Sequence, residues 1–212
     1  MSAPDRLSID RTVLVLLAAG RGSRFGDIDA KLEQEFLGRA LGLHVAVALE
    51  DMPFLARVAV VGTANLDYAR HGFDIRRNDD PSQGMARSVR IGIDAAETTG
   101  ADAVLIALAD MPRVTAAHIH RLFDASTGAD SVVASSDGVD PKPPALFGRG
   151  RFGFLKTLDG DSGARDLVRA GRHVVTAPAE LIDVDTPAEL EALRLLVHAP
   201  EAITRRYKPI RP

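Results

Sequence analysis

Two long apolar runs stand out from the mixed pattern of hydrophobic and polar residues along this chain. They are "TVLVLLAA" at residues 12–19 and "AVLIALA" at residues 103–109. Runs without a polar side are typical of strands that are buried on both faces of a parallel sheet. Shorter segments predict further strands, namely "RVAVVG" at 57–62, "SVVASS" at 131–136, "PALF" at 144–147, "HVVTAP" at 173–178 and "LIDVD" at 181–185.

Helical periodicity falls between these strands. Residues 84–97 predict one helix, with an apolar side that contains Met85, Val89 and Ala96. A second helix is predicted to begin after Thr115, a good N-cap residue, and its apolar stripe consists of Ile119, Leu122 and Phe123. Each helix therefore has one face that is suited to packing on a sheet.

The clearest helix start lies near the end of the chain. Thr186 is the expected N-cap, Pro187 takes the first helical position, and Glu189 completes a capping box at the third. Strands and helices thus alternate along the sequence. This alternation predicts an α/β fold with three layers, in which helices cover both faces of a mostly parallel sheet.

Length and composition limit the number of domains. With 212 residues, of which 46% are hydrophobic, the chain can form one substantial core but hardly two. We expect an N-terminal extension at residues 1–11, one domain at 12–197 and a basic tail at 198–212. We expect the tail to be solvated, with docking on a partner as the alternative.

Charge and cysteine content exclude several classes of function. The net charge of −3 gives no general attraction to nucleic acid or to an anionic membrane. The absence of cysteine excludes disulfides, thiolate catalysis and cysteine-bound metal. The first ten residues lack the pattern of a signal peptide, and no apolar run approaches bilayer length. We therefore expect a cytoplasmic protein.

The loop after the first apolar run is rich in glycine and arginine. Glycines can bring backbone N–H groups close to a ligand, and arginine and lysine match phosphate oxygens. The loop contains Gly20, Arg21, Gly22, Arg24 and Gly26, and Lys31 follows it. Its spacing fits neither a P-loop nor the dinucleotide-binding fingerprint. The loop therefore predicts a phosphate site of another kind.

Acidic residues follow two other predicted strands. Asp110 comes directly after the run at 103–109. Asp183 and Asp185 are the third and last residues of "LIDVD", just before the predicted helix start at Thr186. Ligands of open α/β sheets bind at the carboxyl ends of the strands, so these carboxylates are expected near the glycine-rich loop. Two carboxylates beside bound phosphates provide the oxygen ligands that Mg²⁺ prefers. The sequence therefore predicts a magnesium site at this edge.

Six motifs occur in order along the chain. They are "LAAGRGSRFG" at 17–26 with Lys31 after it, "GMARS" at 84–88, "LADMP" at 108–112, "PALF" at 144–147, "DGDSGARDL" at 159–167 and "IDVDTP" at 182–187. The set resembles the nucleotidyltransferases that attach a nucleotide to molybdopterin, and most of all the molybdenum cofactor cytidylyltransferases. The resemblance covers residues 12–196. It implies a Rossmann-like nucleotidyltransferase fold, Mg²⁺ as cofactor, and a molybdoenzyme or maturation factor as protein partner.

The resemblance also implies roles for single residues. Arg24 and Lys31 match the residues that contact the phosphates, and Asp110 matches the metal-binding aspartate. Asp185 is the expected second metal ligand, with Asp183 as the alternative. The nucleotide is expected to contact Leu17, Ala18, Ala19, Gly20, Arg21, Gly22, Gly84, Met85 and Ser88. The acceptor is expected to contact Asp161, Gly163 and Arg165.

The first loop bears on the choice of base. "LAAG" resembles the cytidylyl branch, whereas the guanylyl branch tends to have a second glycine at the position of Ala19. The resemblance thus implies transfer of CMP from CTP to the terminal phosphate of molybdopterin, with release of pyrophosphate.

The chain departs from the family pattern at two places. Four residues, "DIDA", separate Gly26 from Lys31 where the family has two, so we expect Arg24 to contribute more to NTP binding than Lys31. "DPKPP" precedes "PALF" where the family tends to have a Gly-His approach. Two alternatives therefore stay open. One is transfer from CTP or GTP to another small phosphorylated acceptor, and the other is a non-catalytic domain that binds nucleotide or docks on a partner.

Two further patterns are not interpreted as functional sites. "DGDSG" at residues 159–163 resembles the start of an EF-hand, but Ala164 replaces the required glycine and Ala170 the final glutamate. His118 and His120 are two residues apart on a predicted helix and therefore lie on different faces. We expect both histidines to be ordinary packing or surface residues.

Overall fold

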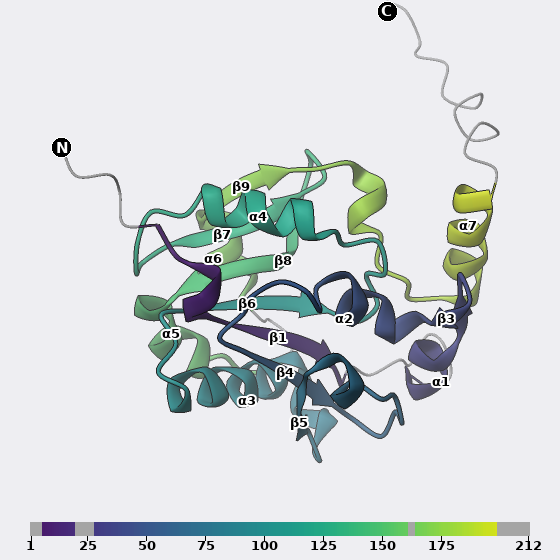
Figure 1. Ribbon diagram of the computed structural model, residues 1–212, viewed down its shortest axis with the longest axis horizontal. Coiled ribbons are helices and arrows are strands. Elements are labelled where there is room, and N and C mark those ends of the chain that lie inside the picture. Colours follow the sequence, from purple (N-terminus) through teal and green to yellow (C-terminus); the bar gives the residue numbers. More distant parts are fainter. Residues whose placement is uncertain (1–5, 20–27, 161–163, 199–212) are drawn as a thin grey trace, which may run out of the picture.

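A computed structural model describes residues 6–19, 28–160 and 164–198 of the protein. Its centre is a sheet with the strand order β5-β4-β1-β6-β8-β7-β9 (Figure 1). β8 runs antiparallel to its neighbours β6 and β7, and the other pairs of this sheet are parallel. The strands are β1 (Thr12–Ala18), β4 (Ala56–Val61), β5 (Asp74–Arg77), β6 (Ala103–Leu108), β7 (Val132–Ser136), β8 (Pro141–Gly148) and β9 (Arg172–Val175).

Helices cover both faces of the sheet, which confirms the predicted three layers (Figure 1). One face carries α2 (His44–Ala48) and α4 (Ala116–Asp124), and the other carries α3 (Gly84–Thr98), α5 (Phe152–Lys156) and α6 (Arg165–Ala170). The short 3-10 helices are η1 (Ile9–Arg11), η2 (Leu41–Leu43), η3 (Ala69–His71), η4 (Pro81–Gln83), η5 (Arg149–Arg151) and η6 (Pro178–Leu181).

The central strand β1 is buried along its whole length. Its residues alternate between the two layers, so that Val13 and Val15 pack in the core under α3 while Leu14 and Leu16 pack in the core under α2 and α4. Helix α3 comes close to β1 at Gly92, where an added Cβ would collide with the side chain of Val15. Burial on both faces explains why this segment has no polar side.

A third, smaller core joins residues 36–41 to the C-terminal part of the described chain. Helix α7 (Pro187–His198) packs beside the hairpin of β2 (Glu35–Phe36) and β3 (Arg39–Ala40), next to α1 (Ile28–Glu33) (Figure 1). The buried residues of this core are Phe36, Leu41, Val184, Leu190 and Leu193. This packing brings the segment before α7 to the neighbourhood of α1.

Both predicted helix caps are confirmed. The Thr115 hydroxyl accepts a hydrogen bond from the His118 N–H at 3.2 Å. Thr186 Oγ1 accepts from the Glu189 N–H at 3.2 Å, and Glu189 Oε2 accepts from the Thr186 N–H at 2.8 Å, which completes the capping box. Ile119, Leu122 and Phe123 form the buried stripe of α4 as expected.

Two expectations about local structure were wrong. Residues 182–185 are irregular and not part of a strand, and a backbone hydrogen bond from the Val184 N–H to the Asp110 carbonyl at 3.0 Å holds them beside the end of β6. Met85 is 44% exposed, because it lies in the first turn of α3, whereas Val89 and Ala96 are buried as expected.

The N-terminal residues that the structure describes lie against the core. Leu7 packs on the cluster under α4, and its N–H donates to Ser126 Oγ at 3.0 Å. Within the described residues, the structure contains no helix whose length and apolar character would let it span a membrane. The division into an extension, a domain and a tail stays a prediction.

Candidate active site

Three segments that are far apart in the sequence meet at the carboxyl edge of the parallel strands. The Ala109 N–H, just after β6, donates to the Leu17 carbonyl of β1 at 3.0 Å. The hydrogen bond between Val184 and Asp110 adds the segment before α7 to the same edge. Asp110, Asp183 and Asp185 therefore gather where an open α/β sheet binds its ligand.

Lys31 lies between two of these carboxylates. Its Nζ donates to Oδ2 of Asp110 at 2.8 Å and to Oδ1 of Asp185 at 3.3 Å. The Lys31 side chain is only 3% exposed, against 41% for Asp185. Lys31 is therefore a buried cation that draws the two acidic segments together.

The inserted residues do not move Lys31 away from the site. Residues 28–30 form the first turn of α1, and Lys31 is the fourth residue of that helix. The helical turn takes up the extra chain length, so the ammonium still reaches Asp110. The displaced position of Lys31 was the observation that favoured a non-catalytic domain, and the structure removes it.

Opposing effects act on the pKa of Asp110. Burial raises its pKa above the ordinary value, the positive charge and hydrogen bond of Lys31 act in the opposite direction, and Asp183 and Asp185 add to the rise. Its Oδ1 atom is buried and has no hydrogen-bond partner among the described residues. A nearby cation would relieve both the repulsion among these carboxylates and the cost of burying a charge.

The residues of this edge fit a divalent metal. Since one ammonium reaches both Asp110 and Asp185, a metal ion beside it could also bind an oxygen of each. The described residues contain no cluster of three histidine, aspartate or glutamate side chains able to hold a metal. Mg²⁺ commonly binds one or two carboxylates and takes its other ligands from water and substrate phosphates. The donor set therefore suits Mg²⁺ that arrives with a nucleotide.

The segment matched to the nucleoside lies at the start of α3. Gly84 adopts a positive φ of 71°, which favours glycine, and Met85 next to it is exposed. Ser88 is buried, and its Oγ accepts a hydrogen bond from Asn78 Nδ2 at 2.9 Å. Ser88 therefore anchors α3 to the segment after β5, and Met85 offers the exposed surface.

The acceptor segment begins near the same end of α3. The Ala86 N–H donates to the Gly160 carbonyl at 3.2 Å, which brings the loop after α5 to the helix start. Arg165 is exposed at the first position of α6. Asp161 and Gly163 lie outside the described residues, as do Gly20, Arg21, Gly22 and Arg24 of the first loop. Leu17, Ala18 and Ala19 are buried at the end of β1.

Sequence reasoning missed two buried polar residues near these segments. Asn78 follows β5 and is 3% exposed, and its Oδ1 accepts from Arg87 Nε at 2.9 Å. The position of Asn78 just after a strand is the one sequence feature that could have indicated its importance. Tyr68 is fully buried, and no sequence pattern marked it.

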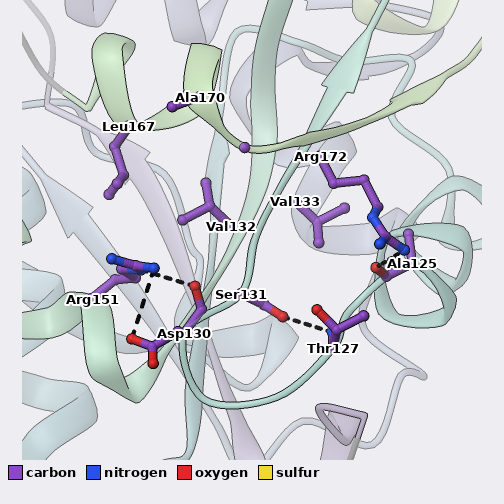
Figure 2. Close-up of a pocket in the computed structure, with 11 residues that line it drawn as sticks. Ala125, Thr127, Asp130, Ser131, Val132, Val133, Arg151, Leu167, Ala170 and Arg172 are labelled. Carbon is purple, nitrogen blue, oxygen red and sulfur yellow. Dashed lines mark hydrogen bonds and ion pairs between the residues drawn. The ribbon is translucent and has the colours of Figure 1, made fainter. Parts of the chain in front are cut away.

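A cavity of about 370 Å³ lies at the opposite edge of the sheet (Figure 2). Its walls include Val132 and Val133 at the start of β7 and Arg172 at the start of β9. Both of its arginines are occupied, since Arg151 Nε donates to the Asp130 carbonyl at 2.8 Å and Arg172 Nη1 to the Ala125 carbonyl at 3.0 Å. The cavity is therefore separate from the site around Asp110.

Comparison with known proteins identifies the family of the chain. The model of the MobA-like NTP transferase domain family matches residues 14–176, which include Lys31 and Asp110 but not Asp185. The purine catabolism protein PucB of Bacillus subtilis is 30% identical over 196 residues, which cover 85% of this chain and 94% of PucB. A molybdenum cofactor guanylyltransferase of Methylibium petroleiphilum is 29% identical, over 68% of this chain and 72% of that protein.

Solved structures show the same fold. A homologue of Mycobacterium tuberculosis Rv0371c from Mycobacterium sp. strain JC1 superposes with a TM-score of 0.73 at 28% identity, over 92% of this chain and 100% of that one. Rv0371c itself, in a complex with manganese, superposes with a TM-score of 0.67 at 26% identity, over 86% of this chain and 97% of that one. The chain belongs to the MobA-like NTP transferase family and is a nucleotidyltransferase.

Proposed function

We propose that this protein transfers CMP from CTP to the terminal phosphate of a molybdopterin-type cofactor and releases pyrophosphate. The observation that carries the proposal is the meeting of Lys31, Asp110 and Asp185 at the carboxyl edge of the sheet. We assign Asp110 and Asp185 to the metal, and Arg24 and Lys31 to the phosphates of the nucleotide. Gly84 and Met85 at the start of α3 are assigned to the nucleoside.

The reaction needs positioning more than proton transfer. An oxygen of the acceptor phosphate forms a bond to the α-phosphorus of CTP, while the bond from that phosphorus to the oxygen bridging to the β-phosphorus breaks, and pyrophosphate leaves with the electron pair. A phosphate nucleophile is already ionised near neutral pH, so no general base is required. When bound, Mg²⁺ supplies positive charge to the phosphoryl oxygens. Lys31 and Arg24 add charge on the protein side.

Two observations support the choice of acceptor and base. One relative bears the name molybdenum cofactor guanylyltransferase, so nucleotidyl transfer to this class of acceptor occurs among similar proteins. Ala19, buried at the end of β1, occupies the position where the guanylyl branch tends to have glycine. A methyl group there leaves less room for a purine, which favours cytosine.

A second candidate is transfer to another small phosphorylated acceptor. It is favoured by β8, which begins with "PKPP" in place of the Gly-His approach of the family. Lys142 of this segment forms an ion pair with Asp137 at 2.8 Å, and together they place charge at the carboxyl end of β7. This arrangement suits an acceptor pocket whose shape differs from that of a molybdopterin pocket.

Pyrophosphate release tests both candidates. The purified protein is incubated with Mg²⁺, with CTP or GTP, and with molybdopterin, a sugar phosphate or a phosphorylated acid, and the product is identified by mass. We expect product from CTP and molybdopterin, with kcat/KM for CTP about tenfold or more above that for GTP. The Asp110→Asn variant serves as the inactive control.

Other outcomes separate the candidates. Equal or faster turnover of GTP would contradict the cytidylyl assignment and leave nucleotidyl transfer in place. Product from another phosphorylated acceptor, with none from molybdopterin, would favour the second candidate.

A further inference from the structure

Two buried polar atoms near the site have no hydrogen-bond partner among the described residues. They are the phenolic oxygen of Tyr68 and Oδ1 of Asp110. Leaving a buried donor or acceptor unpaired typically costs about 1–3 kcal/mol, so each such atom in a folded protein calls for an explanation. One of them is a good donor and the other a good acceptor.

The surroundings of the Tyr68 hydroxyl lie close to Lys31. An added Cβ at Gly42 would come within 2.8 Å of the hydroxyl oxygen and within 3.1 Å of the Leu32 Cβ, so both atoms border the same small space. Leu32 follows Lys31 in α1, and Lys31 contacts Asp110. Tyr68 also belongs to the same core cluster as Met111, which follows Asp110.

The electrostatics agree with this placement. Burial, and after it the negative charge of Asp110, raise the pKa of Tyr68 above its ordinary value. The phenol therefore keeps its proton at neutral pH and acts as a hydrogen-bond donor, which a nearby acceptor would satisfy. The other carboxylate oxygen of Asp110, Oδ2, is already bound to Lys31, which leaves Oδ1 for the hydroxyl.

We propose that Tyr68 is a positioning residue, whose hydroxyl donates a hydrogen bond to one buried water that in turn donates to Oδ1 of Asp110. This bridge holds the carboxylate so that Oδ2 faces Lys31, and Oδ2 would be the oxygen of Asp110 that is offered to a metal. The inference rests on the proposed role of Asp110 as a metal ligand. Partners that orient a ligand in this way typically contribute tenfold or more to metal affinity.

The test is the Tyr68→Phe variant, with Mn²⁺ as the probe. Binding of Mn²⁺ to the nucleotide-free protein is followed by the electron paramagnetic resonance signal of the free ion. We expect the Kd for Mn²⁺ to rise about tenfold, with the KM for CTP at saturating Mn²⁺ close to that of the wild type. Tyr207→Phe makes the same chemical change in the tail, and we expect it to leave the Kd unchanged.

The possible results distinguish the inference from the proposed function. If Tyr68→Phe raises the melting temperature and leaves the Kd for Mn²⁺ unchanged while Asp110→Asn weakens binding, the hydroxyl is only an unpaired group and the inference is overturned. If Asp110→Asn also leaves Mn²⁺ binding unchanged, both the inference and the proposed metal site are overturned. The Kd for Mn²⁺ is measured without CTP or acceptor, so the choice of base or acceptor does not affect this part of the test.

Discussion

Lys31 shows how one side chain can organise a site. A buried ammonium is costly unless opposite charges and hydrogen bonds compensate it, and here two carboxylates from distant segments do so. The two carboxylates would repel the phosphates of a nucleotide if no cation lay beside them. A cation is therefore required at this place both for the fold and for the proposed reaction.

Asp110→Asn tests whether the negative charge of Asp110 is needed to bind the metal. The substitution keeps the shape of the side chain and removes its charge, so we expect the rate to fall by about 10²-fold or more. We expect the melting temperature to stay within about 3 °C of the wild type, because the side chain keeps its shape and Asp185 still compensates the charge of Lys31. Initial rates of pyrophosphate release and thermal melting measure the two effects.

Asp185→Asn is the matched variant. Its side chain is more exposed than that of Asp110, so we expect a smaller loss of rate that Mn²⁺ partly restores. Wild-type turnover in both variants would remove the two-carboxylate metal site. A large fall in melting temperature for Asp110→Asn would instead indicate that this residue serves the turn after β6.

At the scale of elements, a buried hydrogen-bond network fastens α4 to β7 and β8. Ser135 Oγ donates to the Pro144 carbonyl at 2.7 Å, so His118 Nε2 must donate to Ser135 Oγ, which lies 2.7 Å away. The Nδ1 atom of His118 then accepts from Arg121 Nη2 at 3.1 Å. His118 is thus a neutral packing residue, as the sequence led us to expect for both histidines of this helix.

This network predicts a pH dependence of stability. Burial and the charge of Arg121 lower the pKa of His118 below its ordinary value of about 6.5. Below that pH the unfolded chain takes up a proton that the folded protein resists, so the free energy of unfolding falls as the pH decreases. We expect His118→Gln to lose less stability than the wild type between pH 7.5 and 5.5, as measured by urea unfolding.

His120→Gln is the control for this prediction. His120 is exposed on the same helix, so its replacement should leave the pH dependence as in the wild type. Equal losses for His118→Gln and the wild type over this pH range would contradict the assigned role of His118.

At the scale of the whole molecule, the site depends on contacts between an early and a late segment of the chain. Lys31 and Asp185 are 154 residues apart, and the packing of α7 on the β2–β3 hairpin brings their segments together. Glu189 of α7 also accepts a hydrogen bond from the Asp185 N–H at 2.8 Å. Helix α7 therefore supports the proposed metal site.

Truncation separates α7 from the tail that follows it. We expect a chain that ends at residue 198 to keep the melting temperature and the rate of pyrophosphate release, because the small core around Leu190 and Leu193 stays intact. A chain that ends at residue 186 loses this core, and we expect it to lose both properties. If the chain that ends at residue 198 loses activity but keeps its melting temperature, the tail contributes to the reaction.

The sequence by itself determined the elements whose burial follows a simple local pattern. Continuous apolar runs predicted β1 and β6, and capping residues predicted the starts of α4 and α7, because burial and capping depend on neighbours within a few residues. Family motifs also pointed to Lys31, Asp110 and Asp185 as candidates. The edge strand β5 was not predicted, because all its residues are exposed and its pairing with β4 is not visible in hydrophobicity.

Only the tertiary structure decided how these candidates meet. "LIDVD" has the composition of a strand, yet one hydrogen bond to Asp110 and the packing of Val184 hold it as an irregular segment. The insertion before Lys31 predicted a displaced cation, but a helical turn absorbs it. Tyr68 became a candidate only when its hydroxyl and Oδ1 of Asp110 were found without hydrogen-bond partners among the described residues. Contacts across such sequence separations arise from packing, and no local pattern of residues encodes them.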